Sequence, residues 1–283
     1  MMKIILQNDL IIPRGDAVAD IDDRGYQFGD GIYEVIRYYG GRPFMMEEHL
    51  TRLWRSAREL GIEIEFTQEE LEARLGDLAK KSAAGTGALY IQVTRGVYSR
   101  IQEFPPSDLP VQLTAYFREL VRPDEKIATG VAVALVPDIR WLRCDIKSLN
   151  LIPNVLGRQK AKERGCYEAI QHRDSVVTEG AFSNVFRISG KTVFTHPANN
   201  FVLSGVTRGR VLEVCAAGGV VVEEEAFTVE ELLSADEVFI TSTTNEVMPV
   251  VKVDDKVIGG GKPGAMTKRI QSLYEQSIFN WVE

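Results

Sequence analysis

The sequence predicts an α+β protein built as two domains. Apolar residues recur at helical spacing in "MEEHLTRLWRSARELG", whereas "ALYIQVTRGV" and "VAVALVPDIRW" have the short apolar or alternating patterns of strands. Helical and strand patterns are mixed on both sides of a polar stretch that contains Pro123 and Gly130. With 283 residues, 45% of them hydrophobic, the chain is long enough for two ordinary domains.

Three segments follow from this division. We expect a smaller α+β domain at residues 1–120, an interdomain linker at 121–133 and a larger α+β domain at 134–283. The linker is expected because "RELVRPDEKIATG" is polar and carries a proline and a glycine. Ligand sites are common where domains meet, so the catalytic residues are expected at the junction.

Within the smaller domain, short apolar runs open the chain, and Gly40-Gly41 separates two strand-like halves as a hairpin turn would. A helix follows and is expected to end at Gly61, a residue that favours the left-handed cap conformation. A second helix is expected to begin at Thr67, because Thr67 and Glu70 have the spacing of a capping box.

The larger domain has the same mixture of patterns. A capping box is expected at Thr228 and Glu231, and a turn at Asp254-Asp255. Strands are expected in "VAVALVPDIRW", "YEAIQH", "VVTEG", "NVFRIS", "TVFTHP" and "DEVFITST", and helices in "NVLGRQKAKERGC", "VTRGRVLEVCAAGG" and "AMTKRIQSLYEQSIF".

Charge and cysteine content narrow the class of protein. The formal net charge of −7 disfavours wholesale binding to nucleic acid or to anionic membranes. The three cysteines are far apart and have no metal-binding spacing, which favours a reducing compartment. No apolar run approaches the ~18 residues of a membrane span, and the N-terminus lacks the apolar core of a signal peptide. We therefore expect a soluble cytoplasmic protein with no membrane partner.

Other common chemistries have weak support. The three histidines are scattered without metal-ligand spacing, so no metal site is expected. No G-x-S-x-G motif appears, which disfavours a serine hydrolase. The glycines of "DRGYQFGDGIYEV" lead into a strand rather than opening a helix, so this stretch is not a dinucleotide-binding loop. From the residues alone, a structural turn and a functional role are equally good interpretations of it.

Several residues are candidates for chemistry, each with an ordinary alternative. Lys147, in "RCDIKSLNLIPN", lies between a strand-like run and a helix, although most lysines are surface residues. Glu179 follows two β-branched residues at an expected strand end, where a surface glutamate is the default. A phosphate could be held by Arg52, by the start of the helix in "SGVTRGR", or by the hydroxyls of "TSTTNE". Each of these signals alone is weak, because such residues are usually helix caps or solvated.

Taken together, nine stretches resemble the fold-type IV pyridoxal-phosphate enzymes, the class IV aminotransferases, and most resemble their D-amino-acid transaminases. The likeness runs in order over nearly the whole chain. The stretches are "DRGYQFGDGIYEV", "EEHLTRL", "QVTRGVYSR", "IKSLN", "CYEAI", "VTEGAFSNVF", "THPANN", "SGVTR" and "TSTTNEVMPV".

The resemblance implies a two-domain fold-type IV structure and pyridoxal 5′-phosphate as cofactor. It implies that Lys147 is the Schiff-base lysine and carries the proton between the substrate Cα and the cofactor. Such a lysine needs surroundings that disfavour its charged form, because only a neutral amine is nucleophilic and basic. It also implies that Glu179 pairs with the pyridine nitrogen and that further residues hold the rest of the cofactor: Arg52, Leu203, Val206, Thr207, Ser242 and Thr243.

For the substrate, the resemblance implies that Tyr33 lies beside the reacting centre and that Arg100 binds the α-carboxylate. Arg100 and Gln102 are expected to reach in from the neighbouring subunit of a homodimer. The family has histidine where this chain has Gln102, and a neutral amide donates a weaker hydrogen bond than a cation. Phe182 also departs from the family pattern, which has small polar residues there, and is expected to narrow the pocket.

The implied activity is transfer of an amino group between D-amino acids, such as D-alanine or D-glutamate, and 2-oxo acids. Alternatives that keep the cofactor are a branched-chain L-amino-acid aminotransferase, an R-selective amine transaminase and an aminodeoxychorismate lyase. An arginine in "TRGVYSR" favours the D-specific enzyme over the branched-chain one. An alternative of another class is a binding module for phosphate ligands, which would need neither Lys147 nor Glu179.

Overall fold

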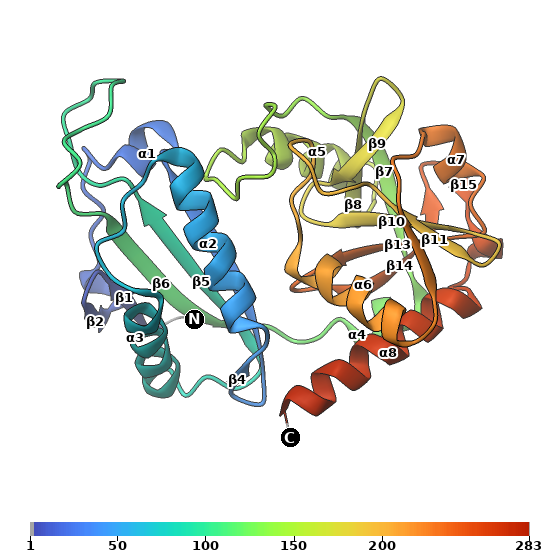
Figure 1. Cartoon of the computed structure of the whole chain (residues 1–283), viewed down its shortest axis with the longest axis horizontal. Helices are drawn as coiled ribbons and strands as arrows, with labels where there is room; N and C mark the ends of the chain where they lie inside the picture. Colours follow the sequence, from blue (N-terminus) through green and yellow to red (C-terminus); the bar gives the residue numbers. More distant parts are fainter. Residues whose placement is uncertain (1–2, 283) are drawn as a thin grey trace. The chain divides into compact units, whose positions relative to one another are not determined.

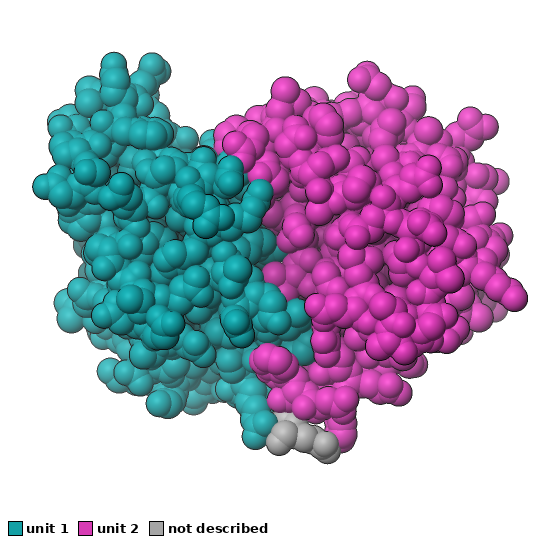
Figure 2. Space-filling model, viewed as in Figure 1, with its two compact units in different colours: residues 1–121, 146–150, 282 teal, residues 122–145, 151–281, 283 magenta. Residues whose placement is uncertain are grey.

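The computed structural model describes residues 3–282 and divides into two compact units, coloured separately in Figure 2. Unit 1 contains the described residues up to Val121 together with Ile146–Asn150. Unit 2 contains Arg122–Asp145 and Leu151–Trp281. The inclusion of residues 146–150 in unit 1 differs from the predicted boundaries, which leave them within the larger domain.

Unit 1 is a six-stranded sheet with helices (Figure 1). Its strand order is β2-β1-β6-β5-β3-β4, and the buried faces of α2 and α3 form one apolar core with the sheet. The elements are β1 (Ile4–Gln7), β2 (Leu10–Pro13), the 3-10 helix η1 (Arg14–Asp16), α1 (Arg24–Phe28), β3 (Gly31–Tyr39), β4 (Arg42–Pro43), α2 (Met46–Leu60), α3 (Gln68–Lys81), β5 (Gly87–Thr94) and β6 (Gln112–Glu119).

The local predictions for unit 1 are confirmed except at one helix. Gly40 and Gly41 turn β3 into β4, and Gly61 caps α2 in the left-handed conformation. The capping box of α3 is present. The Glu70 backbone N–H donates to the Thr67 hydroxyl, and the Thr67 backbone N–H donates to the Glu70 carboxylate. The short helix α1 was not predicted, because five residues are too few to show helical periodicity.

Unit 2 is a nine-stranded sheet in the order β12-β11-β10-β13-β14-β7-β8-β9, with β15 paired to β14. Strands β7 and β8 are parallel, and α5 crosses between them. The elements are α4 (Asp124–Thr129), β7 (Val131–Pro137), α5 (Ile152–Glu163), β8 (Glu168–Arg173), β9 (Val176–Gly180), β10 (Asn184–Ser189), β11 (Thr192–Thr195), α6 (Val206–Ala217), β12 (Val221–Glu224), α7 (Val229–Leu233), β13 (Glu237–Ser242), β14 (Glu246–Val253), β15 (Lys256–Val257), the 3-10 helix η2 (Gly259–Gly261) and α8 (Ala265–Val282).

The segment at 121–133, predicted as a linker, is not irregular. It contains α4 and the first residues of β7, and Ile127 is buried in the core of unit 2. Arg122 is fixed by ion pairs with Glu246 at 2.8 Å and Glu275 at 2.5 Å. Buried contacts and ion pairs therefore order this polar stretch.

The capping box at Thr228 and Glu231 is present at the start of α7, and Asp254 lies at the turn between β14 and β15. Among residues 3–282, no helix is long and apolar enough to cross a membrane.

Candidate active site

The backbone of Lys147 is held at the edge of the unit 1 sheet. Residues 146–150 lie antiparallel to the first half of β3: the Tyr33 N–H donates to the Lys147 carbonyl at 3.1 Å, and the Leu149 N–H donates to the Gly31 carbonyl at 2.9 Å. Gly31 permits this approach, because a Cβ there would lie 2.8 Å from a methyl group of Leu149. Gly31, the first residue of β3, is therefore required by close packing and is not a nucleotide-binding feature.

The side chain of Lys147 points at an aromatic ring. Its Nζ lies 4.4 Å from the centroid of the Tyr33 ring, within the range of a cation–π contact. The Lys147 N–H donates to the Ser56 hydroxyl of α2 at 3.3 Å. The structure therefore brings together two of the predicted residues, Lys147 and Tyr33, with the amine fixed relative to the ring.

A buried charge cluster links α2 to β3 in the same unit. The Arg52 guanidinium donates to both oxygens of Glu34, at 2.7 and 2.9 Å, and the His49 ring lies 2.7 Å from the same carboxylate. Burial alone would raise the pKa of Glu34, but the Arg52 charge and the hydrogen bonds with Arg52 and His49 hold it well below its ordinary value. Glu34 is thus an anion that fixes the plane of Arg52.

The charge of Lys147 acts on this cluster. Burial lowers the pKa of His49; Glu34 opposes the shift, and the positive charges of Arg52 and Lys147 add to it. His49 is therefore held mainly neutral at neutral pH, and one ring nitrogen is directed at Glu34.

In unit 2, Glu179 is the second-last residue of β9, and its buried carboxylate accepts hydrogen bonds from three residues. One carboxylate oxygen accepts from the Leu203 N–H at 3.0 Å and from the Asn184 amide at 3.1 Å, and the other accepts from Arg140. Burial raises the pKa of Glu179, while Arg140 and the Leu203 N–H act in the opposite direction. The structure therefore joins the predicted residues Glu179 and Leu203 through a direct hydrogen bond.

The cation beside Glu179 is itself held by a second buried carboxylate. Arg140 donates to both oxygens of Asp138, at 2.9 and 2.7 Å, and Asp138 also accepts from Thr178 at 2.9 Å and pairs with Arg173 at 3.2 Å. Although burial alone would raise the pKa of Asp138, these arginines hold it well below its ordinary value. Arg140 thus bridges two carboxylates and cannot move without breaking both pairs.

The start of α6 offers donors for an anion. No side chain caps this helix, so its first N–H groups, at Val206 and Thr207, remain directed out of the helix. Asn184 packs against Gly205, where a Cβ would lie 2.2 Å from the amide oxygen, and its amide nitrogen donates to the Leu203 carbonyl at 2.8 Å. Asn184 therefore ties the start of α6 to Glu179.

Strand β13 ends beside this point, because Asn184 of β10 pairs in register with Thr241. The hydroxyl of Ser242 is buried and has no hydrogen-bond partner in the described part of the chain. Thr243 follows in the turn. A buried donor without a partner and an uncapped helix start are what a bound phosphate group requires, so these residues fit the phosphate that the resemblance implies.

The remaining predicted residues lie on exposed segments. Arg100 and Gln102 are exposed on the loop after β5, where the Arg100 guanidinium lies 4.8 Å from the centroid of the Phe28 ring. Phe182 is 44% exposed on the turn between β9 and β10.

Sequence reasoning missed the partners of the predicted residues. Asn184 lies within a stretch that carries the resemblance and Arg140 lies six residues before another, yet nothing in their spacing assigns them to Glu179. Glu34 and His49 had a usable signal: both are polar residues among apolar neighbours of a buried strand and helix, where a charge needs a partner.

Comparison with proteins of known function agrees with this geometry. The chain is 46% identical over 279 residues to a D-alanine aminotransferase of Bacillus licheniformis, covering 99% of this chain and 98% of the relative. It is 43% identical to a D-alanine aminotransferase of Staphylococcus aureus (strain N315), over 98% of each chain. A D-alanine aminotransferase of Listeria monocytogenes is 42% identical, over 98% of this chain and 96% of the relative.

Solved structures share the fold. A branched-chain amino acid aminotransferase of Escherichia coli superposes with a TM-score of 0.91 at 25% identity, over 96% of this chain and 93% of that chain. A branched-chain amino acid aminotransferase of Thermobaculum terrenum, solved in its PLP form, superposes with a TM-score of 0.87 at 24% identity. The match covers 99% of this chain and 94% of that chain. These matches confirm the predicted fold class. The model of the amino-transferase class IV family matches residues 31–253, and this chain therefore belongs to the class IV aminotransferases.

Proposed function

We propose that this chain is a pyridoxal-phosphate-dependent transaminase that moves an amino group between D-amino acids, such as D-alanine or D-glutamate, and 2-oxo acids. The observation that carries the substrate class is the 46% identity to a D-alanine aminotransferase along nearly the full length of both chains. The fixed amine of Lys147 and the enclosed carboxylate of Glu179 support the same chemistry, because binding of a phosphate ligand alone needs neither.

Lys147 is proposed to bind the cofactor covalently through Nζ and, once the amino substrate takes its place, to carry a proton away from the substrate Cα. When bound, pyridoxal 5′-phosphate supplies a ring that accepts the electron pair released at that carbon. The backbone bonds of Lys147 to β3 and the contact of its Nζ with Tyr33 limit where the amine can reach. Positioning of this kind is a large part of a catalytic base's effect.

Glu179 is proposed to accept a hydrogen bond from the protonated pyridine nitrogen. A buried carboxylate with a raised pKa gains most from a nearby positive charge, so it favours protonation of that nitrogen. Arg140, held by Asp138, opposes the effect of burial on the pKa of Glu179 and orients its carboxylate.

The phosphate is proposed to bind Arg52 and the donors at the start of α6 and the end of β13, namely Val206, Thr207, Ser242 and Thr243. Glu34 supports this role for Arg52 by fixing the guanidinium plane. Leu203, whose N–H holds Glu179, is proposed to pack against the cofactor ring.

For the substrate, Arg100 is proposed to bind the α-carboxylate, with a weaker contribution from Gln102. Tyr33 is proposed to lie beside the reacting carbon, since its ring contacts Lys147. Phe182 is proposed to limit the size of the substrate side chain. A neutral amide at Gln102 forms a hydrogen bond about half as strong as a charged one, so broader and weaker substrate binding is expected than with a cation there.

We further propose that the protein acts as a homodimer in the cytoplasm, with Arg100 and Gln102 contributed to the partner's site. Helix α5 supports the dimer: Ile152, Val155 and Leu156 share one helix face and are 71%, 52% and 48% exposed, which is costly in a lone chain. The free state of all three cysteines is compatible with a reducing compartment.

A branched-chain L-amino-acid aminotransferase is the second candidate, because such enzymes superpose closely on this chain. Spectral half-reactions separate the two. We expect D-alanine and D-glutamate to change the absorbance of the cofactor-loaded protein within one turnover, and L-leucine to leave it unchanged over the same time. Conversion by L-leucine alone would reverse the assignment.

Replacing the lysine tests its proposed role. Lys147→Ala should lower kcat by at least the ~10²–10⁴-fold that a positioned acid–base group contributes. Reduction with borohydride should fix the cofactor to the wild-type chain and not to the variant, as read by mass spectrometry. Wild-type turnover in Lys147→Ala would refute the assignment.

Glu179→Gln keeps the shape of the side chain and removes its charge. We expect kcat to fall by about 10²–10³-fold, the range seen when one preorganised electrostatic contact is removed. Glu179→Asp, which keeps the charge, should retain more activity than Glu179→Gln. Equal loss in the two variants would mean that packing rather than charge matters at this position.

The dimer is tested on α5. Light scattering should give twice the mass of one chain for the wild type, and Val155→Glu should shift the protein toward the monomer with loss of activity. Lys81→Glu, a change at an exposed side chain at the end of α3, is the control and should stay dimeric. A fully active wild-type monomer would contradict the cross-subunit role of Arg100.

A further inference from the structure

Two arginines share one aromatic ring in unit 1. Phe28 is the last residue of α1, and its ring centroid lies 4.8 Å from the Arg100 guanidinium carbon and 4.9 Å from that of Arg24. No acidic side chain among the described residues forms an ion pair with Arg100, which leaves its charge available to an anionic ligand. The ring is thus the contact that holds this guanidinium.

Arg24 fixes the backbone on both sides of Arg100. It is buried, and its guanidinium donates to the Ile101 carbonyl at 2.7 Å. Its N–H donates to the Gly96 carbonyl at 3.0 Å. Arg24 therefore holds the backbone of this loop at Gly96, before Arg100, and at Ile101, after it.

Asp30 connects Arg24 to a second buried arginine. Its carboxylate accepts from the Arg24 Nε at 2.8 Å and from the Arg95 Nε and Nη2 at 2.8 and 3.0 Å. Burial alone would raise the pKa of Asp30, but the two arginines hold it below its ordinary value. One carboxylate thus holds the end of β5 and the start of α1 together.

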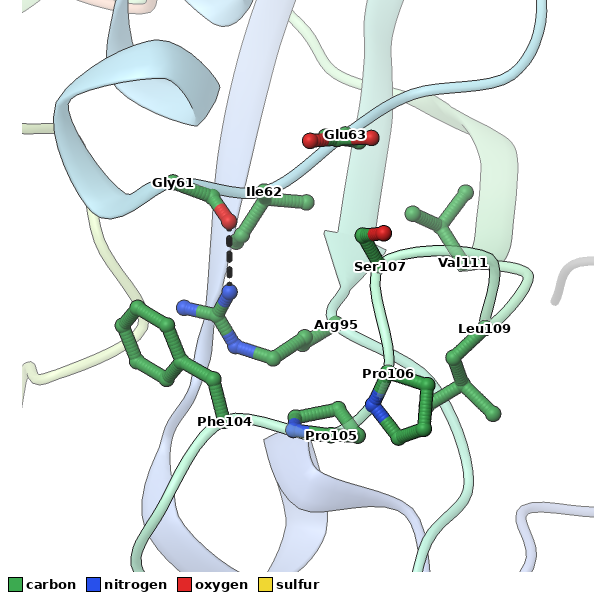
Figure 3. A pocket seen from close by; sticks show the side chains of 10 residues that line it. All are labelled: Gly61, Ile62, Glu63, Arg95, Phe104, Pro105, Pro106, Ser107, Leu109 and Val111. Carbon is green, nitrogen blue, oxygen red and sulfur yellow. Dashed lines mark hydrogen bonds between the residues drawn. The ribbon is translucent and has the colours of Figure 1, made fainter.

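Arg95 in turn anchors the loop to the end of α2. It donates to the Gly61 carbonyl at 2.6 Å and the Leu60 carbonyl at 2.8 Å, and the Phe104 ring lies 3.8 Å from its guanidinium carbon. Figure 3 shows Arg95 reaching Gly61 with Phe104 beside it, next to a cavity of about 160 Å³. Arg95 thus ties the loop after β5 to the end of α2 through two hydrogen bonds and one aromatic contact.

We propose that Phe28 is a positioning residue for substrate: its ring, held in place by the Arg24–Asp30–Arg95 cluster, orients the Arg100 guanidinium toward the substrate α-carboxylate. This inference rests on the proposed function. A free arginine loses side-chain entropy when it binds a carboxylate, and holding it beforehand lowers that cost. The cluster has two cations and one anion, so its net positive charge also favours an approaching carboxylate.

The test replaces the ring. Phe28→Leu keeps an apolar side chain and removes the cation–π contact, so we expect KM for D-alanine and for the 2-oxo acid to rise about two- to fivefold. The dissociation constant of propionate, an unreactive carboxylate, should rise by the same factor in the cofactor-loaded protein. We expect kcat to stay within about twofold and the absorbance of the bound cofactor to be unchanged.

Two matched variants separate positioning from structure. Phe28→Tyr keeps a ring and should restore KM to within about twofold of the wild type. Tyr26→Leu makes the same kind of change on the same helix at an exposed side chain and should leave KM and the propionate constant as in the wild type. Equal effects of Phe28→Leu and Tyr26→Leu would show damage to α1 rather than to Arg100, and would overturn the inference.

Arg100→Ala distinguishes this inference from the proposed function. If Arg100→Ala weakens propionate binding strongly while Phe28→Leu does not, the proposed function stands and the positioning role of Phe28 is wrong. If Arg100→Ala has no effect on amino acids or on propionate, the proposed carboxylate site is wrong and the inference fails with it. If Arg100→Ala and Phe28→Leu both weaken propionate binding and Phe28→Tyr restores it, the carboxylate site and the positioning role of Phe28 are both supported.

Discussion

The backbone pairing of residues 146–150 with the edge of β3 is the constraint on which the candidate site depends. A long, flexible lysine side chain gains a defined reach only if its backbone cannot move, and two hydrogen bonds to β3 with one to Ser56 provide this. Gly31 is needed in this pairing, because a Cβ there would lie 2.6 Å from the Val93 carbonyl oxygen of β5 and 2.8 Å from a Leu149 methyl group. This short strand addition thus fixes the backbone of the lysine that is proposed to be catalytic.

In each unit, a buried carboxylate fixes the position of an arginine. Glu34 holds Arg52 in unit 1, and Asp138 holds Arg140 against Glu179 in unit 2. Burying these ions costs free energy that their pairing only partly offsets, so such clusters are better explained by geometry than by stability. Each fixes one group that is proposed to contact the cofactor, and each explains why an isolated substitution would leave a buried charge unpaired.

The sequence predicted what depends on local pattern. The helix caps at Thr67 and Thr228 were predictable because a capping box acts over three residues. The ion pair of Arg140 with Glu179 joins residues 39 apart, and that of Arg95 with Asp30 residues 65 apart, and no local pattern encodes such a partner. The helical state of residues 124–129 was also missed, since it follows from burial of Ile127. Lys147 and Glu179 have only weak local signals, and their proposed roles come from the family resemblance.

The choice of an aromatic partner for Arg100 has a physical reason. A carboxylate would hold the guanidinium more firmly than a ring, but it would occupy the donors that a substrate carboxylate needs and would neutralise the attracting charge. The Phe28 ring restrains the guanidinium through its face and leaves the N–H groups free to donate. Asp30 pairs instead with Arg24 and Arg95, so it anchors the loop without occupying the Arg100 donors. One carboxylate, Asp30, therefore fixes the loop, while the guanidinium of Arg100 keeps its donors for the carboxylate that it is proposed to bind.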